Sequence, residues 1–75
     1  MSIQNLIASV NERFTPTERR IAEGILDDPM LLAFGTVTGL ADRIGTSRAS
    51  IVRFATKLGF EGYSDLQRSV REELS

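Results

Sequence analysis

Residues 47–57 combine arginines with small side chains in a pattern that suits contact with the edges of DNA bases. On a helix of about 100° per residue, the outer side of this segment carries Ala49, Val52, Arg53 and Thr56, with Arg48 and Lys57 on the flanks. The major groove accepts such a helix, because base edges there offer acceptors to arginine and methyl groups to small apolar side chains. The pattern therefore predicts a helix that binds double-stranded DNA in the major groove.

Side-chain chemistry assigns roles on this outer side. Arg53 is the best candidate for a bidentate contact with guanine, and Arg48 suits either a base or a phosphate. Ala49 and Val52 are small enough to approach a thymine methyl closely. An exposed arginine is often merely solvated, but the position of Arg53 on this side favours the contact with DNA.

Other polar residues suit the DNA backbone rather than the bases. Ser47 and Ser50 lie at the expected helix N-terminus, where a phosphate oxygen is favoured. Arg43 and Lys57 are expected to contact phosphates without specifying sequence, although for either residue alone simple solvation is an equally good interpretation. The full predicted DNA-binding set is Arg43, Ser47, Arg48, Ala49, Ser50, Val52, Arg53, Thr56 and Lys57.

Two short helices joined by a tight turn would present this surface. Leu40, Ala41 and Ile44 repeat at helical spacing, and Gly45 follows where a left-handed residue would end the helix. Ser47 can cap the second helix. The buried side of that helix is expected to consist of Ile51, Phe54, Ala55 and Leu58. A small residue at Ala41 lets the two helices approach, as in a DNA-binding helix-turn-helix.

Three further helices and one apolar turn are expected to support this pair. Apolar spacing predicts helices within 3–14, 16–26 and 64–74, and a single turn at 30–34 that plugs the core. Capping boxes are predicted where the second and last of these helices begin, formed by Thr15 with Glu18 and by Ser64 with Gln67. Gly24, inside a helix, is expected to face a close neighbour or a gap. The predicted fold class is an all-α bundle of about five helices.

The composition restricts the possible functions. With 75 residues, of which 41% are hydrophobic, residues 1–75 make one small domain. The absence of cysteine and histidine excludes disulfides, a zinc finger and a catalytic triad with a histidine base. No apolar run approaches the roughly 20 residues of a membrane span, so we expect a cytoplasmic domain without membrane contact. No metal or cofactor is expected.

Charge is distributed unevenly along the chain. The net charge is −1, yet residues 36–60 hold four cations and one anion, a net charge of +3. Residues 1–35 and 61–75 each carry a net charge of −2. Because the positive segment coincides with the predicted helix-turn-helix, its location favours a nucleic-acid partner despite the acidic total.

Two other classes of function fit less well. A helical protein-interaction module could use the same basic face, and salt-sensitive binding to duplex DNA would distinguish the two. An enzyme is the weakest alternative, because Glu18 and Glu23 lie on predicted solvent-facing sides and no glycine-rich phosphate loop is present. Arg19 and Arg20, beside these acids, are expected to form local ion pairs.

Two blocks of the sequence resemble the N-terminal domain of the RpiR family of bacterial transcription regulators. The first block spans 14–29 and includes Thr-Pro-Thr-Glu-Arg-Arg-Ile-Ala; the second spans 47–66 and begins Ser-Arg-Ala-Ser-Ile-Val-Arg-Phe. The resemblance implies a helical DNA-binding domain of winged-helix-like type without a pronounced wing. Two positions depart from the family pattern, since Gly24 stands where an aromatic residue is common and Gly39 where an acidic residue is common.

The resemblance also implies partners. Members of the family usually join this domain to a C-terminal sugar-isomerase-like (SIS) domain that senses phosphosugars and dimerises, and no such domain is present in these 75 residues. We therefore expect a homodimer that controls genes of sugar or sugar-phosphate metabolism, with its phosphosugar effector bound only by the missing domain. Dimerisation also follows from physics, because one short helix contacts too few bases for strong specificity.

Overall fold

The computed structural model describes residues 2–75, which form six α-helices. They are α1 (Ile3–Val10), α2 (Pro16–Asp27), α3 (Pro29–Phe34), α4 (Val37–Ile44), α5 (Arg48–Lys57) and α6 (Tyr63–Leu74), with a 3₁₀ turn at Asn11–Arg13. No strand occurs within this described part, so the predicted all-α class is confirmed. None of its helices is both long enough and apolar enough to cross a membrane.

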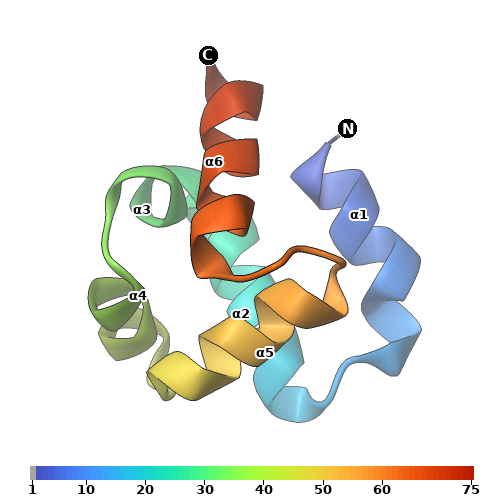
Figure 1. The fold of residues 1–75 in the computed structure, drawn as a ribbon. Helices are drawn as coiled ribbons and strands as arrows, with labels where there is room; N and C mark the ends of the chain where they lie inside the picture. The colour runs from blue at the N-terminus through green and yellow to red at the C-terminus, as the bar shows by residue number, and fades with distance from the viewer. Residues whose placement is uncertain (1) are drawn as a thin grey trace.

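The helix α5 and the two chain ends lie on opposite sides of the molecule. In Figure 1, α5 runs along the bottom, whereas both termini lie at the top, beside the ends of α1 and α6. The helix α2 contacts α3, α4 and α5. It therefore connects the predicted helix-turn-helix, α4 and α5, to the rest of the bundle.

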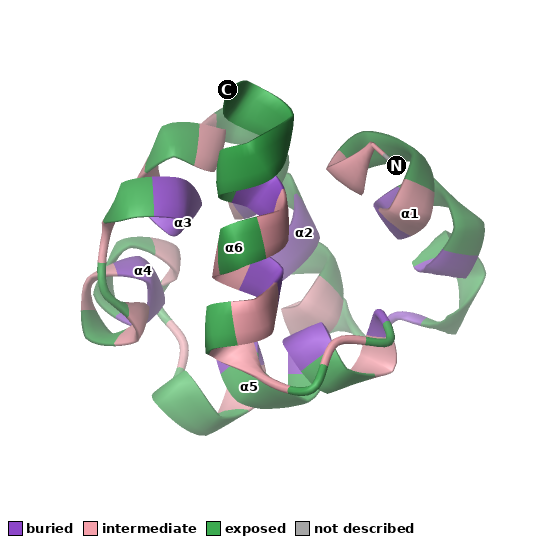
Figure 2. Cartoon of the chain, turned by 45° about the horizontal axis from the view of Figure 1, so that its top comes forward, coloured by how far each residue is buried: buried purple, intermediate pink, exposed green. Residues whose placement is uncertain are grey.

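One apolar core fills the space between the helices. Its largest fully buried side chains are Phe54, Ile21, Ile25, Leu32, Leu40, Ile51, Leu66 and Val70. The ring of Phe54 packs on that of Phe14, with the ring centroids 5.3 Å apart. In Figure 2, α6 changes between buried and exposed colours along its length, as expected for a helix with one side in the core. All four apolar residues predicted for the inner side of α5 are buried.

Side-chain caps begin most of the helices. The predicted capping box of α2 is confirmed: Thr15 Oγ1 accepts from the N–H of Glu18 at 3.2 Å, and Glu18 Oε1 accepts from the N–H of Thr15 at 2.8 Å. The capping box predicted at Ser64 is wrong, because α6 begins one residue earlier and has no side-chain cap. Its first residue, Tyr63, instead donates its hydroxyl to the carbonyl of Leu32 at 3.3 Å. A long-range contact therefore holds the start of α6.

The short helix α3 plugs the core with only some of the residues at 30–34, and Leu31 is only partly buried. Leu32 and Ala33 are buried, as expected for a core turn. The prediction is wrong for Met30 and Phe34, which are 55% and 62% exposed, because successive positions on a helix cannot all face one side. Phe34 lies under the guanidinium of Arg71, whose carbon is 5.5 Å from the ring centroid.

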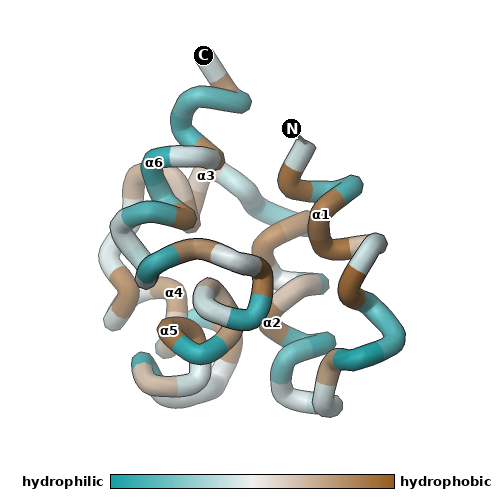
Figure 3. The backbone as a smooth tube through the Cα atoms, turned by 45° about the vertical axis from the view of Figure 1, so that its right-hand side comes forward, coloured by the Kyte–Doolittle hydropathy of each residue, from teal (hydrophilic) through white to brown (hydrophobic). Residues whose placement is uncertain are grey.

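The last helix, α6, fastens the loop between α3 and α4. The side-chain amide of Gln67 donates to the carbonyl of Gly35 at 2.8 Å and to that of Leu32 at 3.2 Å. The tube in Figure 3 alternates between hydrophobic and hydrophilic colours along α6. The same helix therefore supplies both core residues and the polar residues that bond this loop. Through these contacts α6 supports the start of α4.

The helices α2 and α4 approach closely at Gly24. A Cβ atom at this position would lie only 2.9 Å from Cγ1 of Ile44, so of the two predicted alternatives, a close neighbour or a gap, the close neighbour is confirmed. Glycine inside a helix costs about 1 kcal/mol relative to alanine. Because Gly24 has no side chain, Ile44 can pack directly over the backbone of α2, immediately before the turn that leads to α5.

Candidate nucleic-acid interface

The turn between α4 and α5 has the geometry predicted for a helix-turn-helix. Gly45 adopts φ 84° and ψ 41°, in the left-handed region that favours glycine. The N–H groups of Gly45 and Thr46 both donate to the carbonyl of Ala41, at 2.8 and 2.9 Å, and thereby end α4. Ala41 is 3% exposed, and α4 packs against α5. The predicted pair of helices and their tight turn are therefore confirmed.

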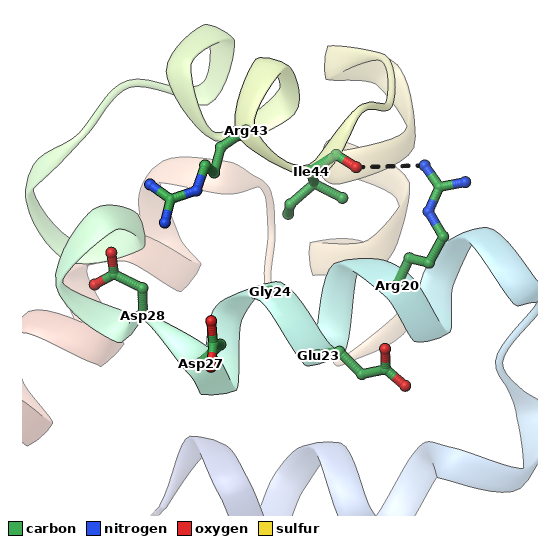
Figure 4. A pocket seen from close by; sticks show the side chains of 7 residues that line it. All are labelled: Arg20, Glu23, Gly24, Asp27, Asp28, Arg43 and Ile44. Carbon is green, nitrogen blue, oxygen red and sulfur yellow. Dashed lines mark hydrogen bonds between the residues drawn. The ribbon is translucent and has the colours of Figure 1, made fainter.

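The side chain of Arg20, on α2, binds this turn from outside. Its Nη2 donates to the carbonyl of Gly45 at 2.8 Å and to that of Ile44 at 3.4 Å, and the latter bond is drawn in Figure 4. A cation is favoured here because the last carbonyls of α4 carry partial negative charge. Arg20 thus connects α2 to the residues that set the direction of α5.

The local ion pairs predicted for the two neighbouring arginines of α2 are not formed. Within residues 2–75, the ion pairs are Lys57 with Glu18 and Arg68 with Asp65. Arg19 donates instead to the side-chain oxygen of Asn11 at 3.0 Å. The prediction was wrong because both arginines reach partners outside α2, which helical spacing does not reveal.

A series of hydrogen bonds orders the beginning of α5. Ser47 Oγ accepts from the N–H of Ser50 at 3.1 Å, as an N-cap does. The hydroxyl oxygens of Ser47 and Ser50 lie 3.0 Å apart, and Arg53 Nη2 donates to Ser50 Oγ at 3.2 Å. The contact with Ser50 orients the Arg53 side chain. Because a guanidinium has five N–H donors, Arg53 keeps donors for another partner.

Most of the predicted DNA-binding residues are exposed. The exposed ones are Arg43, Ser47, Arg48, Ala49, Val52, Arg53 and Thr56, whereas Ser50 and Lys57 are half-buried. The structure brings those on α5 together along its outward side, which is exposed in Figure 2. Val52 is 41% exposed and leaves a small apolar side chain on this polar surface. The hydroxyl of Thr56 donates to the carbonyl of Val52 at 3.1 Å.

The structure separates Arg43 from the α5 surface. Arg43 lies on α4 and, with Arg20, lines a hollow of about 470 Å³ between α2 and α4. Carboxylates of Glu23, Asp27 and Asp28 line the same hollow. In Figure 4 the guanidinium of Arg43 points toward Asp28 and away from α5. A phosphate contact by Arg43 stays a prediction, on a surface of mixed charge.

The ammonium of Lys57 is held within the protein. Its Nζ donates to Glu18 Oε1 at 2.7 Å and to the carbonyl of Arg13 at 2.6 Å. Burial raises the pKa of Glu18, but the hydrogen bonds from Lys57 and Thr15, together with the lysine charge, outweigh it and leave that pKa below its ordinary value. The C-terminal flank of α5 is therefore tied to the start of α2.

Comparison with known proteins places this chain in a family. The family model described as the helix-turn-helix domain of the rpiR family matches residues 1–75. The chain belongs to the rpiR family of helix-turn-helix domains. The resemblance found in the sequence is therefore confirmed, and the rpiR-family domain is a DNA-binding domain of the kind found in transcriptional regulators.

Individual relatives carry the same description. An uncharacterised HTH-type transcriptional regulator of Caldanaerobacter subterraneus is 34% identical over 70 residues, covering 93% of this chain and 25% of the relative. Another from Haemophilus influenzae is 30% identical over 74 residues, covering 99% of this chain and 26% of the relative. A third, YbbH of Bacillus subtilis, is 30% identical over 70 residues, covering 93% of this chain and 25% of the relative. The rpiR-family domain thus spans about a quarter of the length of these relatives.

Replacement of Glu18 by glutamine is expected to make the stability of the rpiR-family domain less sensitive to acid. A depressed folded-state pKa adds stability above the unfolded value of about 4.3, and that stability is lost as the pH falls through the folded value. We expect E18Q to lower the free energy of unfolding by up to about 1 kcal/mol at neutral pH. Urea unfolding at neutral pH and at about pH 3 should show this difference shrink in acid. An equal difference at both pH values would contradict the role of the charge.

Replacement of Arg20 by alanine is expected to loosen the turn of the rpiR-family domain. Removing the donor leaves the carbonyls of Ile44 and Gly45 to water, so the free energy of unfolding should fall by about 1 kcal/mol. Amide hydrogen exchange should quicken most in residues 44–48. A matched control is R68A, which removes an exposed arginine of α6. Faster exchange at the turn in R68A as well, or in neither variant, would contradict the contact.

Proposed function

We propose that this chain binds double-stranded DNA sequence-specifically by placing α5 in the major groove. The observation that carries the proposal is the outward side of α5, where Arg48 and Arg53 are exposed beside the small residues Ala49 and Val52. An arginine can donate two hydrogen bonds to the edge of a guanine, and a small apolar side chain can contact a thymine methyl. The hydroxyls of Ser47 and Ser50, at the N-terminus of α5, suit a phosphate oxygen.

The distribution of charge supports the same proposal. Residues 36–60 carry a net charge of +3, whereas the segments on either side are acidic. Two of these cations, Arg48 and Arg53, are exposed on α5 and form no ion pair within residues 2–75, so their charge would orient the domain as it approaches the duplex. We assign a binding role and no catalytic role to this domain.

The proposed biological role is transcriptional regulation in bacteria, of genes for sugar or sugar-phosphate metabolism. This role rests on membership of the family, because family members usually carry a phosphosugar-sensing SIS domain, and the relatives here are about four times as long as this chain. Within such a protein, the effector would bind the SIS domain and not these residues. The setting we propose is the cytoplasm.

A homodimer is proposed as the binding unit. One α5 helix of 10 residues touches only a few base pairs, which is too few for strong specificity. Two copies related by a two-fold axis would read two half-sites about one helical turn of DNA apart. The preferred sequence should therefore be an inverted repeat.

Selection of duplexes from a random DNA library tests this function. The wild-type domain is fused to a dimerising coiled coil so that even weak binding enriches a sequence. It is compared with R48A/R53A and with the control R68A on α6. Circular dichroism checks that each variant folds. We expect an inverted repeat enriched by wild type and control and lost by R48A/R53A. Failure of the forced dimer to enrich any sequence would overturn the proposal and favour a protein partner for the same basic face.

A further inference from the structure

One of the four cations in the positive segment is neutralised by an acid from another helix. Lys57 Nζ lies 2.7 Å from Glu18 Oε1, and its second partner, the Arg13 carbonyl, lies at 2.6 Å. The side chains of Lys57 and Glu18 are only 29% and 16% exposed. No ion pair is formed by Arg43, Arg48 or Arg53 within residues 2–75. Of the four cations on α4 and α5, Lys57 is therefore the one that an ion pair neutralises within residues 2–75.

The carboxylate that holds Lys57 is itself fixed in place. The same Oε1 atom accepts the N–H of Thr15 at 2.8 Å, and Thr15 Oγ1 accepts the N–H of Glu18 at 3.2 Å. This capping box sets the position of the Glu18 side chain at the first turn of α2. Glu18 is thus a built-in partner for Lys57 rather than a mobile surface acid that a phosphate would easily displace.

We infer that Glu18 limits the non-specific attraction of α5 for DNA phosphates by neutralising Lys57. This inference rests on the proposed DNA-binding function and replaces the phosphate contact that the sequence predicts for Lys57. A close ion pair acts on a phosphate several ångströms away as a dipole, whose field falls off faster than that of a free cation. Affinity for random DNA then depends on the arginines, while the base-reading side of α5 is unaffected.

Glu18 also lies beside the reading arginine. With Ser50 and Arg53, it lines a hollow of about 350 Å³ between the start of α2 and α5, together with Thr15 and Thr17. A DNA strand that entered this hollow would bring its phosphates toward the carboxylate. Because Glu18 is paired with Lys57, Arg53 is the one cation among the five residues that line this hollow, and attraction of a phosphate there depends on that arginine.

The salt dependence of binding to random DNA measures the effect. Each phosphate neutralised by a cation contributes about 0.9 to the slope of log K against log salt. The variant E18Q removes the negative charge but keeps a residue type able to form the capping box. We expect its slope on a random-sequence duplex to be steeper than that of wild type by about 0.9, so that a fourfold rise in salt weakens the binding of E18Q about 3.5-fold more than that of wild type.

Two further variants separate this mechanism from a general change of net charge. E72Q makes the same charge change at an exposed position of α6, away from α5, and Glu72 forms no ion pair within residues 2–75. We expect its slope to stay close to that of wild type. In E18Q/K57Q the freed cation is absent again, so the steeper slope of E18Q should disappear. Fluorescence anisotropy of a labelled random duplex over a range of KCl concentrations measures all four proteins.

The outcomes distinguish this inference from the proposed function. If wild type binds the duplex in a salt-dependent manner and E18Q has the same slope, the inference is overturned and DNA binding stands. The inference also fails if E72Q steepens the slope as much as E18Q, or if E18Q/K57Q keeps the steeper slope. If no variant binds duplex DNA, the proposed function fails and this inference fails with it.

Discussion

Replacement of Arg53 by alanine is expected to reduce affinity for the preferred duplex by about 1–3 kcal/mol, which is roughly 5- to 150-fold. Arg53 is exposed on the outward side of α5, and its hydrogen bond to Ser50 holds the guanidinium toward the N-terminal part of that helix. This part of a recognition helix approaches the base edges most closely. Affinity for random DNA should change much less, because phosphate attraction needs no bidentate geometry.

The measurement compares binding to the selected inverted repeat and to a random duplex at one salt concentration. R68A is a suitable control, since Arg68 is exposed on α6 and pairs only with Asp65 within residues 2–75. The ratio of the two affinities should fall sharply in R53A and stay constant in R68A. Equal losses on both duplexes in R53A would instead make Arg53 a phosphate contact.

Replacement of Phe54 by alanine is expected to destabilise the fold more than any change on the surface of α5. Phe54 is fully buried, and its ring packs on Phe14 at 5.3 Å between centroids. Removing a buried phenyl ring costs about 3–5 kcal/mol. A domain of 75 residues has a total stability of roughly 4–11 kcal/mol. F54A should therefore melt well over 10 °C below wild type.

Thermal unfolding followed by circular dichroism checks this second prediction. V52A, two residues away on the exposed side of α5, serves as its control, and its free energy of unfolding should change by less than about 0.5 kcal/mol. A melting temperature of F54A within a few degrees of wild type would show that this part of the core collapses to fill the cavity. It would then contradict the central position assigned to the ring.

The parts of the fold that local chemistry controls could be predicted from the sequence. The positive φ of Gly45, the Ser47 cap and the Thr15–Glu18 capping box each depend on residues at most three positions apart. The outward side of α5 was predictable for the same reason, because a period of 3.6 residues assigns each side chain to one face. The Ser64 cap failed because α6 begins at Tyr63, so Ser64 lies inside the helix, while the Tyr63 hydroxyl bonds a carbonyl of α3.

The contacts between helices could not be predicted in this way. Lys57 lies 39 residues from Glu18, and Arg20 lies 25 residues from Gly45. Whether such side chains meet depends on how α2 lies across α4 and α5, and no periodicity within one helix contains that information. From the sequence, Arg20 was therefore assigned to an ion pair within its own helix and Lys57 to a DNA phosphate, and the partners of both on other elements were missed.

The contacts of α2 hold α5 at both of its ends. Arg20 binds the turn that precedes α5, and Glu18 binds Lys57 at its last residue. A helix held at both ends is already ordered in the free domain, so binding DNA should order its backbone little further. The conformational entropy lost on binding should therefore be small, and the amide protons of α5 should exchange about as slowly in the free domain as in the bound one.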